Sequence, residues 1–296
     1  MSTDTVTGTR HLTASARARG IPRRRRLRRE GVRWRPSVVA SVLVVAVAIG
    51  FALLPGLFTP LDPLAGTARE ALRPPSAAHW FGTDATGRDL FSRVVYGAVH
   101  SLGGALVAVL VGLVAGTSLG LLAGSIGGWL DAVVMRIVEV LLAIPGLLLA
   151  LSIIILLGFG TTNAAIAVGI TSVATFARLS RSEVISVRRT DYVEAAFGSG
   201  GTFAAVLRRH ILPNSLTPVI ALAALQFGTA IIAISTLGFL GYGAPPPTPE
   251  WGLLIAEGRT YVGTAWWLTT LPGVVVLLVV LSANRLSHAL AQAGAR

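Results

Sequence analysis

Long apolar runs, separated by short polar segments, dominate this chain of 296 residues. Several runs exceed 18 nearly uncharged residues, the length at which an α-helix crosses the hydrocarbon core of a bilayer. Strands of a membrane barrel would alternate over short segments, so the continuous runs favour helices. The pattern predicts six spans: Ser37–Leu54, Val99–Ala123, Val133–Leu157, Ala164–Ala177, Leu216–Leu240 and Trp267–Ala283. The fourth span is short, and we expect its helix to include some of the Ser- and Thr-bearing residues that follow it.

Composition agrees with a membrane protein. Hydrophobic residues make up 53% of the chain, charged residues 13%, and the mean hydropathy is +0.72. A water-soluble domain cannot hide that much apolar surface. The run Ser37–Leu54 is longer than the apolar core of a typical secretory signal, and the following residues 55–60 lack a small-residue cleavage site. We therefore expect an uncleaved first helix.

Arginine is concentrated before the first span. The formal net charge is +12, and eleven arginines lie between Arg10 and Arg35. This placement follows the positive-inside rule for a cytoplasmic N-terminus, and it suits contact with anionic lipid headgroups. Nucleic-acid binding is the alternative, but no aromatic-interleaved or folded reading element accompanies the charge. We expect residues 1–36 to form a disordered, basic cytoplasmic tail.

Six crossings from a cytoplasmic N-terminus return the C-terminus to the cytoplasm. The segment between the fourth and fifth spans is then cytoplasmic, and it is rich in arginine: Arg178, Arg181, Arg188, Arg189, Arg208 and Arg209. The segment before the second span is then outside, and its charges are mixed: Arg69, Glu70, Arg73, Asp84, Arg88, Asp89 and Arg93. Span count and arginine placement predict the same topology.

Two residue types are missing from the sequence. Without cysteine the chain forms no disulfide and no thiolate metal site. Without lysine it cannot build a Walker A loop, so it cannot be a P-loop ATPase by itself. His100, Asn163 and His288 stand alone, and no catalytic motif is present. We expect no catalytic residue and no metal site.

The polar segment Asp191–Asn214 stands between two runs that are each long enough to cross a membrane. Asp191 and Glu194 have the spacing of an N-cap and N3 pair, which predicts a short helix from Asp191. Ala195 and Ala196 would let a partner approach this helix closely. Glycines would end it: Gly198, Gly200 and Gly201.

A second helix, Phe203–His210, is expected next, with Pro213 marking a bend before the fifth span. The whole segment resembles the EAA loop of the permease subunits of ATP-binding-cassette importers. The family pattern is Glu-Ala-Ala, three residues, Gly, then nine residues before an Ile-x-Leu-Pro-like ending. The same intervals separate the matching residues here: Glu194–Ala196, Gly200 and Leu212–Pro213. His210 takes the isoleucine position, and the His-Ile-Leu-Pro-Asn ending is similar to the peptide and nickel branch.

Two further motifs resemble the second, C-type permease of dipeptide and oligopeptide importers. The segment 79–97 is similar to the one before that subunit's second span, and its motif residues include Gly82, Thr83, Asp84, Gly87, Arg88 and Asp89. The segment 238–252 is similar to its outer loop between spans five and six, and Ile144–Gly146 also fits. The resemblance covers about His79 to Asn284. The chain departs from the family in the tail after Asn284, which lacks the usual acids, and in the extra glycines after Ala196.

The outer motifs allow two interpretations. Asp84 and Asp89 are spaced to cap a helix and to pair with Arg88 or Arg93. A self-satisfied amphipathic lid on the outer surface and direct substrate contact are both compatible with this spacing, and we favour a scaffold. The proline-rich residues 244–249 are stiff and are expected to hold Trp251 near the membrane interface.

Polar residues inside the spans are few. Arg136 and Glu139 are three apart near the cytoplasmic end of the third span, so we expect a structural pair rather than a proton relay. Three residues of the fifth span could line a polar route for substrate or form hydrogen bonds between helices: Gln226, Thr229 and Ser235.

The resemblance implies an all-α integral membrane protein of the bacterial cytoplasmic membrane, with the type I importer permease fold and both termini cytoplasmic. The first helix and an extracytoplasmic segment would occupy residues 37–98. The permease domain would occupy residues 99–284 with a coupling loop at 178–214, and a cytoplasmic tail would occupy residues 285–296. The residues implied in coupling to an ATPase are Asp191, Tyr192, Glu194, Ala195, Ala196, Gly200, Arg209 and Pro213.

The resemblance also implies partners. These are a homologous second permease, two cytoplasmic ATPase domains that bind ATP and Mg, and an extracytoplasmic substrate-binding protein. This chain would form half of the path for peptides and would carry no cofactor or catalytic site itself. Nickel chelates, glutathione and haem precursors are alternative substrates. The rival class is a self-sufficient secondary transporter or channel, which should show internal repeats and deep intramembrane charges; the sequence shows neither convincingly.

Overall fold

The structure is a computed structural model that describes residues 36–294, so the predicted basic tail lies outside the described residues except for its last position. The described part is helical, as predicted, with two isolated β-bridges and no longer strand. Its helices are α1 (Pro36–Leu53), α2 (Leu90–Ile126), α3 (Gly128–Ala143), α4 (Gly146–Leu157), α5 (Thr161–Arg188), α6 (Asp191–Gly198), α7 (Phe203–Val206), α8 (Leu212–Phe239), α9 (Trp251–Gly258) and α10 (Trp267–Gly294). A π-helical turn, Leu207–Ile211, joins α7 to α8.

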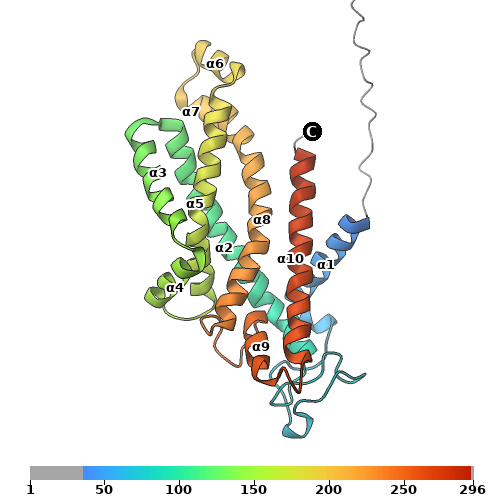
Figure 1. The fold of residues 1–296 in the computed structure, drawn as a ribbon. Coiled ribbons are helices and arrows are strands. Elements are labelled where there is room, and N and C mark those ends of the chain that lie inside the picture. The colour runs from blue at the N-terminus through green and yellow to red at the C-terminus, as the bar shows by residue number, and fades with distance from the viewer. Residues whose placement is uncertain (1–35, 295–296) are drawn as a thin grey trace, which may run out of the picture. The chain divides into compact units, whose positions relative to one another are not determined.

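Five of the described helices are long and apolar enough to cross a membrane, and the bent pair α3 and α4 would make a sixth crossing. The five are α1, α2, α5, α8 and α10, and each overlaps one of the predicted spans; the first and fifth predictions run one residue past the end of α1 and α8. Helix α2 begins at Leu90, before the predicted start at Val99, because Asp89 caps it there. Figure 1 shows α2, α5, α8 and α10 running between the same two ends.

The predicted third span, Val133–Leu157, is not one helix. Helices α3 and α4 meet at an angle of 99°. Pro145 lacks an N–H group and excludes the residue before it from the helical region, and Ile144 accordingly has an extended backbone with ψ of 129°. Helix α4 lies across the end of α3 (Figure 1).

The predicted fourth span ends too early. Helix α5 continues past Ala177 to Arg188, so the first part of the predicted loop 178–214 is helical. Two of its arginines, Arg181 and Arg188, have partners on neighbouring helices. Arg181 makes two bonds to Asp131 of α3, one of them 2.6 Å from Nη2 to Oδ2, and Arg188 donates to the Ser125 carbonyl at the end of α2 at 2.6 Å.

Glycines on one face of α2 allow it to pack closely along α5. A Cβ at Gly116 or Gly120 would overlap the backbone of α5, at the carbonyl oxygens of Val173 and Ala177. Lipid tails are as apolar as the helix side chains, so close van der Waals contact is what holds helices together in a bilayer. The α2–α5 pair is therefore the most closely packed pair of long helices in the described fold.

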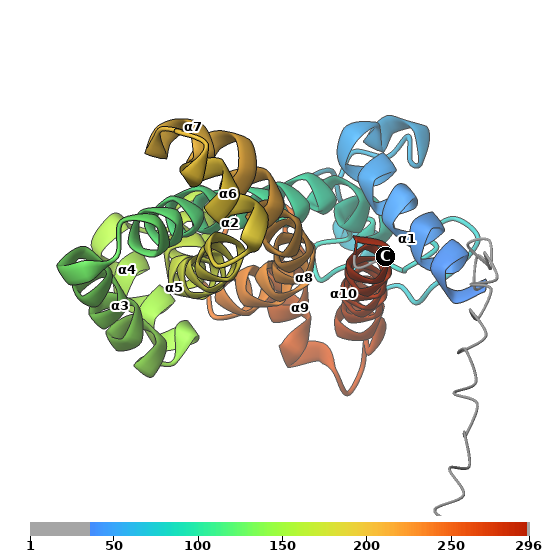
Figure 2. The same cartoon turned by 90° about the horizontal axis from the view of Figure 1, so that it is seen from above.

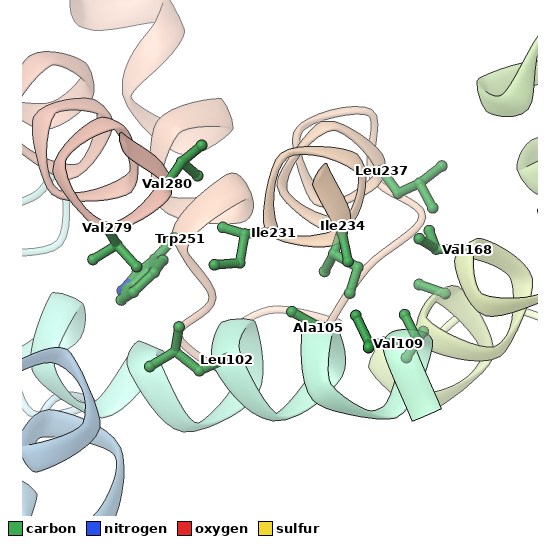
Figure 3. Close-up of a cluster of buried hydrophobic side chains, with 14 of the residues drawn as sticks. Leu102, Ala105, Val109, Val168, Ile231, Ile234, Leu237, Trp251, Val279 and Val280 are labelled. Carbon is green, nitrogen blue, oxygen red and sulfur yellow. The ribbon is translucent and has the colours of Figure 1, made fainter. Parts of the chain in front are cut away.

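The main core gathers side chains of α2, α5, α8, α9 and α10 (Figure 3), together with Ala48 of α1 and Ala150 and Ile154 of α4. Trp251 is fully buried there, and its Nε1 donates to the Val94 carbonyl at 2.9 Å. The indole is therefore enclosed by protein, and the position of Trp251 near the membrane interface stays a prediction. Seen from above, α3 and α4 lie at one edge of these helices and α1 at the other (Figure 2).

Candidate functional site

The sequence motifs lie at opposite ends of the described helices (Figure 1). The segment between α5 and α8, which contains α6 and α7, is at one end. Residues 54–89, the start of α2 and helix α9 are at the other. We call the first the coupling segment and the second the outer region.

The helix predicted from Asp191 is α6, but its capping prediction is wrong. The N-cap is Thr190, which has the extended backbone that this position needs (φ −85°, ψ 144°), whereas Asp191 is already helical. The Thr190 hydroxyl donates to the Val187 carbonyl at 2.6 Å, so no side chain caps α6. Asp191 and Glu194 still lie in the first turn, where the helix dipole favours negative charge.

Glycine ends α6, as predicted. Gly200 has φ of +88°, a left-handed conformation that a side chain would strain. The Gly201 N–H donates to the Ala196 carbonyl at 3.1 Å, which closes the last turn. A Cβ at Gly201 would lie 2.6 Å from that same oxygen. The two glycines are therefore required for different reasons, one for backbone conformation and one for space.

One face of α6 is anchored to the membrane helices. Val193 is fully buried in a small cluster with Val184 of α5, Val206 of α7 and Ile211 of the π-helical turn. Ala196 packs against the same cluster. This cluster therefore joins α6 to α5, α7 and the π-helical turn that leads into α8.

The other face of α6 is exposed. Tyr192 is 45% exposed and Phe197 37%, with Phe203 of α7 at 45%. Asp191, Glu194 and Ala195 are exposed on the same short helix. Aromatic side chains at a charged protein surface are typical of a binding surface rather than of solvated loop.

The predicted second helix, Phe203–His210, does not stand alone. Only Phe203–Val206 is α-helical, and the π-helical turn carries the chain into α8. Pro213 fits at the first turn of α8, where a missing N–H costs little. Arg209 and Pro213 are exposed beside it. Helical backbone, rather than a free hinge, thus joins the coupling segment to α8.

The outer region is built on a buried charge cluster, and the pairing predicted from its spacing is confirmed. Asp84 accepts from Arg88 Nε at 2.6 Å and from Arg93 Nη1 at 2.7 Å. Arg93 is completely buried and also donates to Glu257 Oε2 of α9 at 2.6 Å. These residues border a cavity of about 280 Å³ between the outer loop, α9 and the start of α10.

Hydrogen bonds fix the charge state of Asp84. Burial alone would raise the pKa of its carboxyl, but donors from the Arg88 and Thr86 backbone, the Thr86 hydroxyl and the Arg88 guanidinium outweigh burial and hold the pKa below its usual range. Asp89 caps α2 through the Ser92 N–H at 2.7 Å and also contacts His79 Nδ1 at 2.9 Å.

The remaining motif residues complete this scaffold. Gly82 and Gly87 have φ of +75° and +79°, and a Cβ at either would strike the neighbouring backbone. Thr83 is fully buried, and its hydroxyl accepts from the Arg73 N–H at 2.8 Å. The motif forms a folded loop whose charges are satisfied within it and by α9; whether it contacts substrate stays a prediction.

Glu250 was missed by sequence reasoning. Its side chain is completely buried and accepts from the Gly252 and Leu253 N–H groups, both at 2.9 Å, so it caps α9. It also accepts from the Ser101 hydroxyl of α2 at 3.1 Å. The available signal was an acid directly before an apolar helix, which is the position of an N-cap.

The three polar residues of the fifth span do not share one environment. Thr229 is exposed and Gln226 is half-buried. Ser235 is buried against α9, and the backbone of Ser235 approaches closely there because Gly252 of α9 has no side chain. A role in the path stays a prediction for Gln226 and Thr229. Arg136 and Glu139 do pair, at 3.4 Å between Nη1 and Oε2, on an exposed face of α3.

Long apolar helices with a short anchored helix at one polar end define a multi-pass membrane protein. A family model described as the inner membrane component of binding-protein-dependent transport systems matches residues 116–293. The chain belongs to this family, and it is a transport permease subunit of the inner membrane.

Relatives agree with that family, and solved structures are similar in fold. The dipeptide transport system permease protein DppC of Alkalihalophilus pseudofirmus is 42% identical over 86% of this chain and 84% of its own length. The glutathione transport system permease protein GsiD of Pectobacterium atrosepticum is 42% identical over 74% of this chain and 73% of its own. A chain of the inward-facing MetNI methionine ABC transporter is similar in fold, with a TM-score of 0.59 at 20% identity over 70% of this chain and 98% of its own.

Proposed function

We propose that this permease forms half of a peptide translocation path and is driven through α6 by separate ATPase subunits. The relatives named as dipeptide permeases support the substrate class. The observation that carries the mechanism is the division of α6 into a buried face anchored on Val193 and an exposed face with Tyr192 and Ala195. The exposed face would dock on an ATPase, and the buried face would move α5 and α8.

A docked helix drives a two-state bundle only if it binds differently in the two states. In this proposal the ATPase domains, which bind ATP and Mg, bind α6 with a different affinity or geometry in their closed state than in their open state. Tyr192, Glu194 and Ala195 meet the ATPase, and Gly200 sets the angle at which the chain leaves α6. Asp191, Ala196, Arg209 and Pro213 support that surface.

The complete importer would contain a homologous second permease, two ATPase domains and an extracytoplasmic substrate-binding protein. Six crossings, with α3 and α4 together making the third, would place both termini and the coupling segment in the cytoplasm. The outer region would then face the binding protein. This chain would carry no ATPase site, and only the assembly would hydrolyse ATP.

The test is ATP-driven uptake by the assembled importer in proteoliposomes. Glu194→Ala and Tyr192→Ala, combined, should abolish uptake of a labelled dipeptide while the amount of permease in the membrane stays normal. Glu70→Ala, at an exposed acid far from α6, is the control for the amount of permease in the membrane. Uptake at the wild-type rate in the double variant would contradict the coupling role of α6.

Glutathione is the second candidate substrate, because one relative with 42% identity is a glutathione permease. Mass analysis of the ligand that co-purifies with the cognate binding protein decides between them. A free dipeptide supports the first proposal, and glutathione supports the second. Uptake by this chain alone, with no ATPase present, would contradict both.

A further inference from the structure

The π-helical turn Leu207–Ile211 shifts the buried face of the helix that runs from α7 into α8. Buried residues of α8 and of the turn's end recur every four residues, at Ile211, Ser215 and Val219, which are 0%, 3% and 0% exposed. The next buried residue toward the N-terminus is Val206, at 2% exposure, and it lies five residues before Ile211. The turn therefore contains one residue more than a regular repeat of the buried face would need.

Hydrogen bonding accounts for the extra residue. The Leu212 N–H donates to the Leu207 carbonyl, five residues back, where an α-helix would use the carbonyl four residues back. In an α-helix, side chains five residues apart point about 140° apart. The wider turn places Val206 and Ile211 on the same side, where both pack in the cluster that buries Val193 of α6.

Pro213 explains why the turn is wide at this point. Proline has no N–H, and inside an α-helix its ring would strike the carbonyl four residues back, which belongs to Arg209. Helical backbone precedes Pro213, so this conflict arises here, and a wider turn just before it gives the ring room. The Asn214 side chain also donates to the neighbouring His210 carbonyl at 2.7 Å.

The turn contacts both faces of α6. On the buried side, Ile211 and Val193 share one cluster and are both 0% exposed. On the exposed side, the rings of His210 and Tyr192 lie 6.3 Å apart, measured between their centroids. Along the chain, by contrast, α6 reaches α7 through the glycine-containing residues 199–202. The register of the turn therefore determines where α6 lies relative to α8.

We propose that Pro213 is a positioning residue that keeps the extra residue in the turn and thereby holds α6 and α8 in one register during transport. This inference rests on the proposed function, because the register matters only if α6 receives the movement of the ATPase. With the turn in place, a movement of α6 shifts α8. If the turn relaxes to an α-helix, the residues before it rotate by about 100° relative to α8, and Val206 leaves the cluster.

The first test measures ATP hydrolysed per labelled dipeptide imported by the assembled importer in proteoliposomes. Pro213→Ala restores the N–H and removes the ring, so the extra residue can pass into residues 199–202. This ratio should rise severalfold. Pro218→Ala is the matched control, because it removes a proline from the same helix beyond the turn, and its ratio should equal that of the wild type. A wild-type ratio for Pro213→Ala, or the same rise in both variants, would overturn the proposal.

Deletion of Arg208, an exposed residue of the turn, provides a compensating change. Alone, the deletion puts Ala205 instead of Val206 five residues before Ile211, so the ratio should also rise. Combined with Pro213→Ala, it allows a continuous α-helix with Val206 four residues before Ile211, and the ratio should return to near the wild-type value. If the combined variant recovers neither the ratio nor a normal amount of permease in the membrane, the proposal is wrong.

Spin labels report the same register without transport. Because the chain has no native cysteine, nitroxides can be placed at Ser199→Cys, at the end of α6, and at Ile232→Cys, on α8; both positions are exposed. In the assembled importer their distance distribution should be narrow, should broaden with Pro213→Ala, and should narrow again when Arg208 is also deleted. A distribution that Pro213→Ala leaves unchanged, or one that is already broad without it, contradicts a fixed register.

Failure of the proposed function is recognised separately. If Glu194→Ala combined with Tyr192→Ala leaves uptake normal, α6 does not receive the movement of the ATPase, and this inference fails with the proposed function. If that variant abolishes uptake while Pro213→Ala keeps the wild-type ratio, α6 remains the docking helix and only the role of the turn is wrong.

Discussion

Arg93 and Glu250 are both completely buried ionisable residues in the described part of the chain. Arg93 is the one that joins two carboxylates. It bridges Asp84 of the outer loop and Glu257 of α9, residues far apart in sequence. Burying an ion is expensive, so such a bridge contributes less to stability than its short distances suggest. Removing one partner is nevertheless damaging, because the remaining charge stays buried. The outer motif therefore acts as a structural clamp.

The pH dependence of stability tests this clamp at Asp84. Its folded pKa is lowered, so its contribution is complete above the ordinary aspartate pKa and is lost as pH falls through the folded value. Between about pH 6 and pH 3, which brackets that ordinary value, the melting temperature of the wild-type chain in detergent should fall more steeply than that of Asp84→Asn. Parallel curves for the two proteins would show that Asp84 contributes no such linkage.

Glu250 offers a second residue-scale test. Glu250→Ala leaves the Ser101 hydroxyl and two N–H groups of α9 without an acceptor. A buried unsatisfied group costs about 1–3 kcal/mol, so a clear drop in melting temperature is expected. Glu70→Ala, at an exposed site, should change stability by at most about 0.5 kcal/mol. Equal melting temperatures for the two variants would contradict the role assigned to Glu250.

At the scale of elements, the fold depends on how closely two helices approach. Helices α2 and α5 are in contact along their length because α2 presents glycines there. Tertiary packing also positions helix α6, through the cluster around Val193, because α6 has no side-chain cap at its N-terminus. An eight-residue helix is marginal by itself, so tertiary contact decides its geometry.

A pair of glycine substitutions in α2 measures this close contact. Gly116→Val should destabilise the chain by about 1–3 kcal/mol, since its side chain meets the Val173 carbonyl. Gly103→Ala is the matched control, because nothing lies within 4 Å of a Cβ at that position. That control should be neutral or stabilising, by up to about 1 kcal/mol. Thermal unfolding in detergent distinguishes the two, and a neutral Gly116→Val would refute the packing argument.

At the scale of the whole molecule, the bent pair α3 and α4 decides the topology. The outer region and the coupling segment are separated in sequence by α2, the bent pair and α5. If the pair crosses the membrane, these regions are on opposite sides. If the pair returns to the side it entered from, they are on the same side.

The absence of native cysteine allows a direct test of this topology. Ala77→Cys in the outer region should react with a membrane-impermeant maleimide in intact cells. Ala204→Cys in α7 should react only after the membrane is opened; both positions are exposed in the described structure. Labelling of both residues in intact cells would mean that the bent pair does not cross.

The sequence by itself determined the class of this protein. Apolar run length predicted the long helices, because backbone groups in hydrocarbon must pair within a helix. The motif spacing predicted α6, its glycine end and the pairing of Asp84 with Arg88 and Arg93. These are local signals, carried by residues that are neighbours along the chain.

Only the tertiary structure decided which polar residues have partners. Arg181 of α5 pairs with Asp131 of α3, and the buried Glu250 accepts a hydrogen bond from Ser101 of α2. Thr190 replaced Asp191 as the cap because backbone conformation, rather than residue type, selects that position. Contacts between residues far apart in the sequence stabilise these arrangements of polar side chains. The spacing of residues along the chain does not specify which distant segments meet, so it cannot predict such contacts.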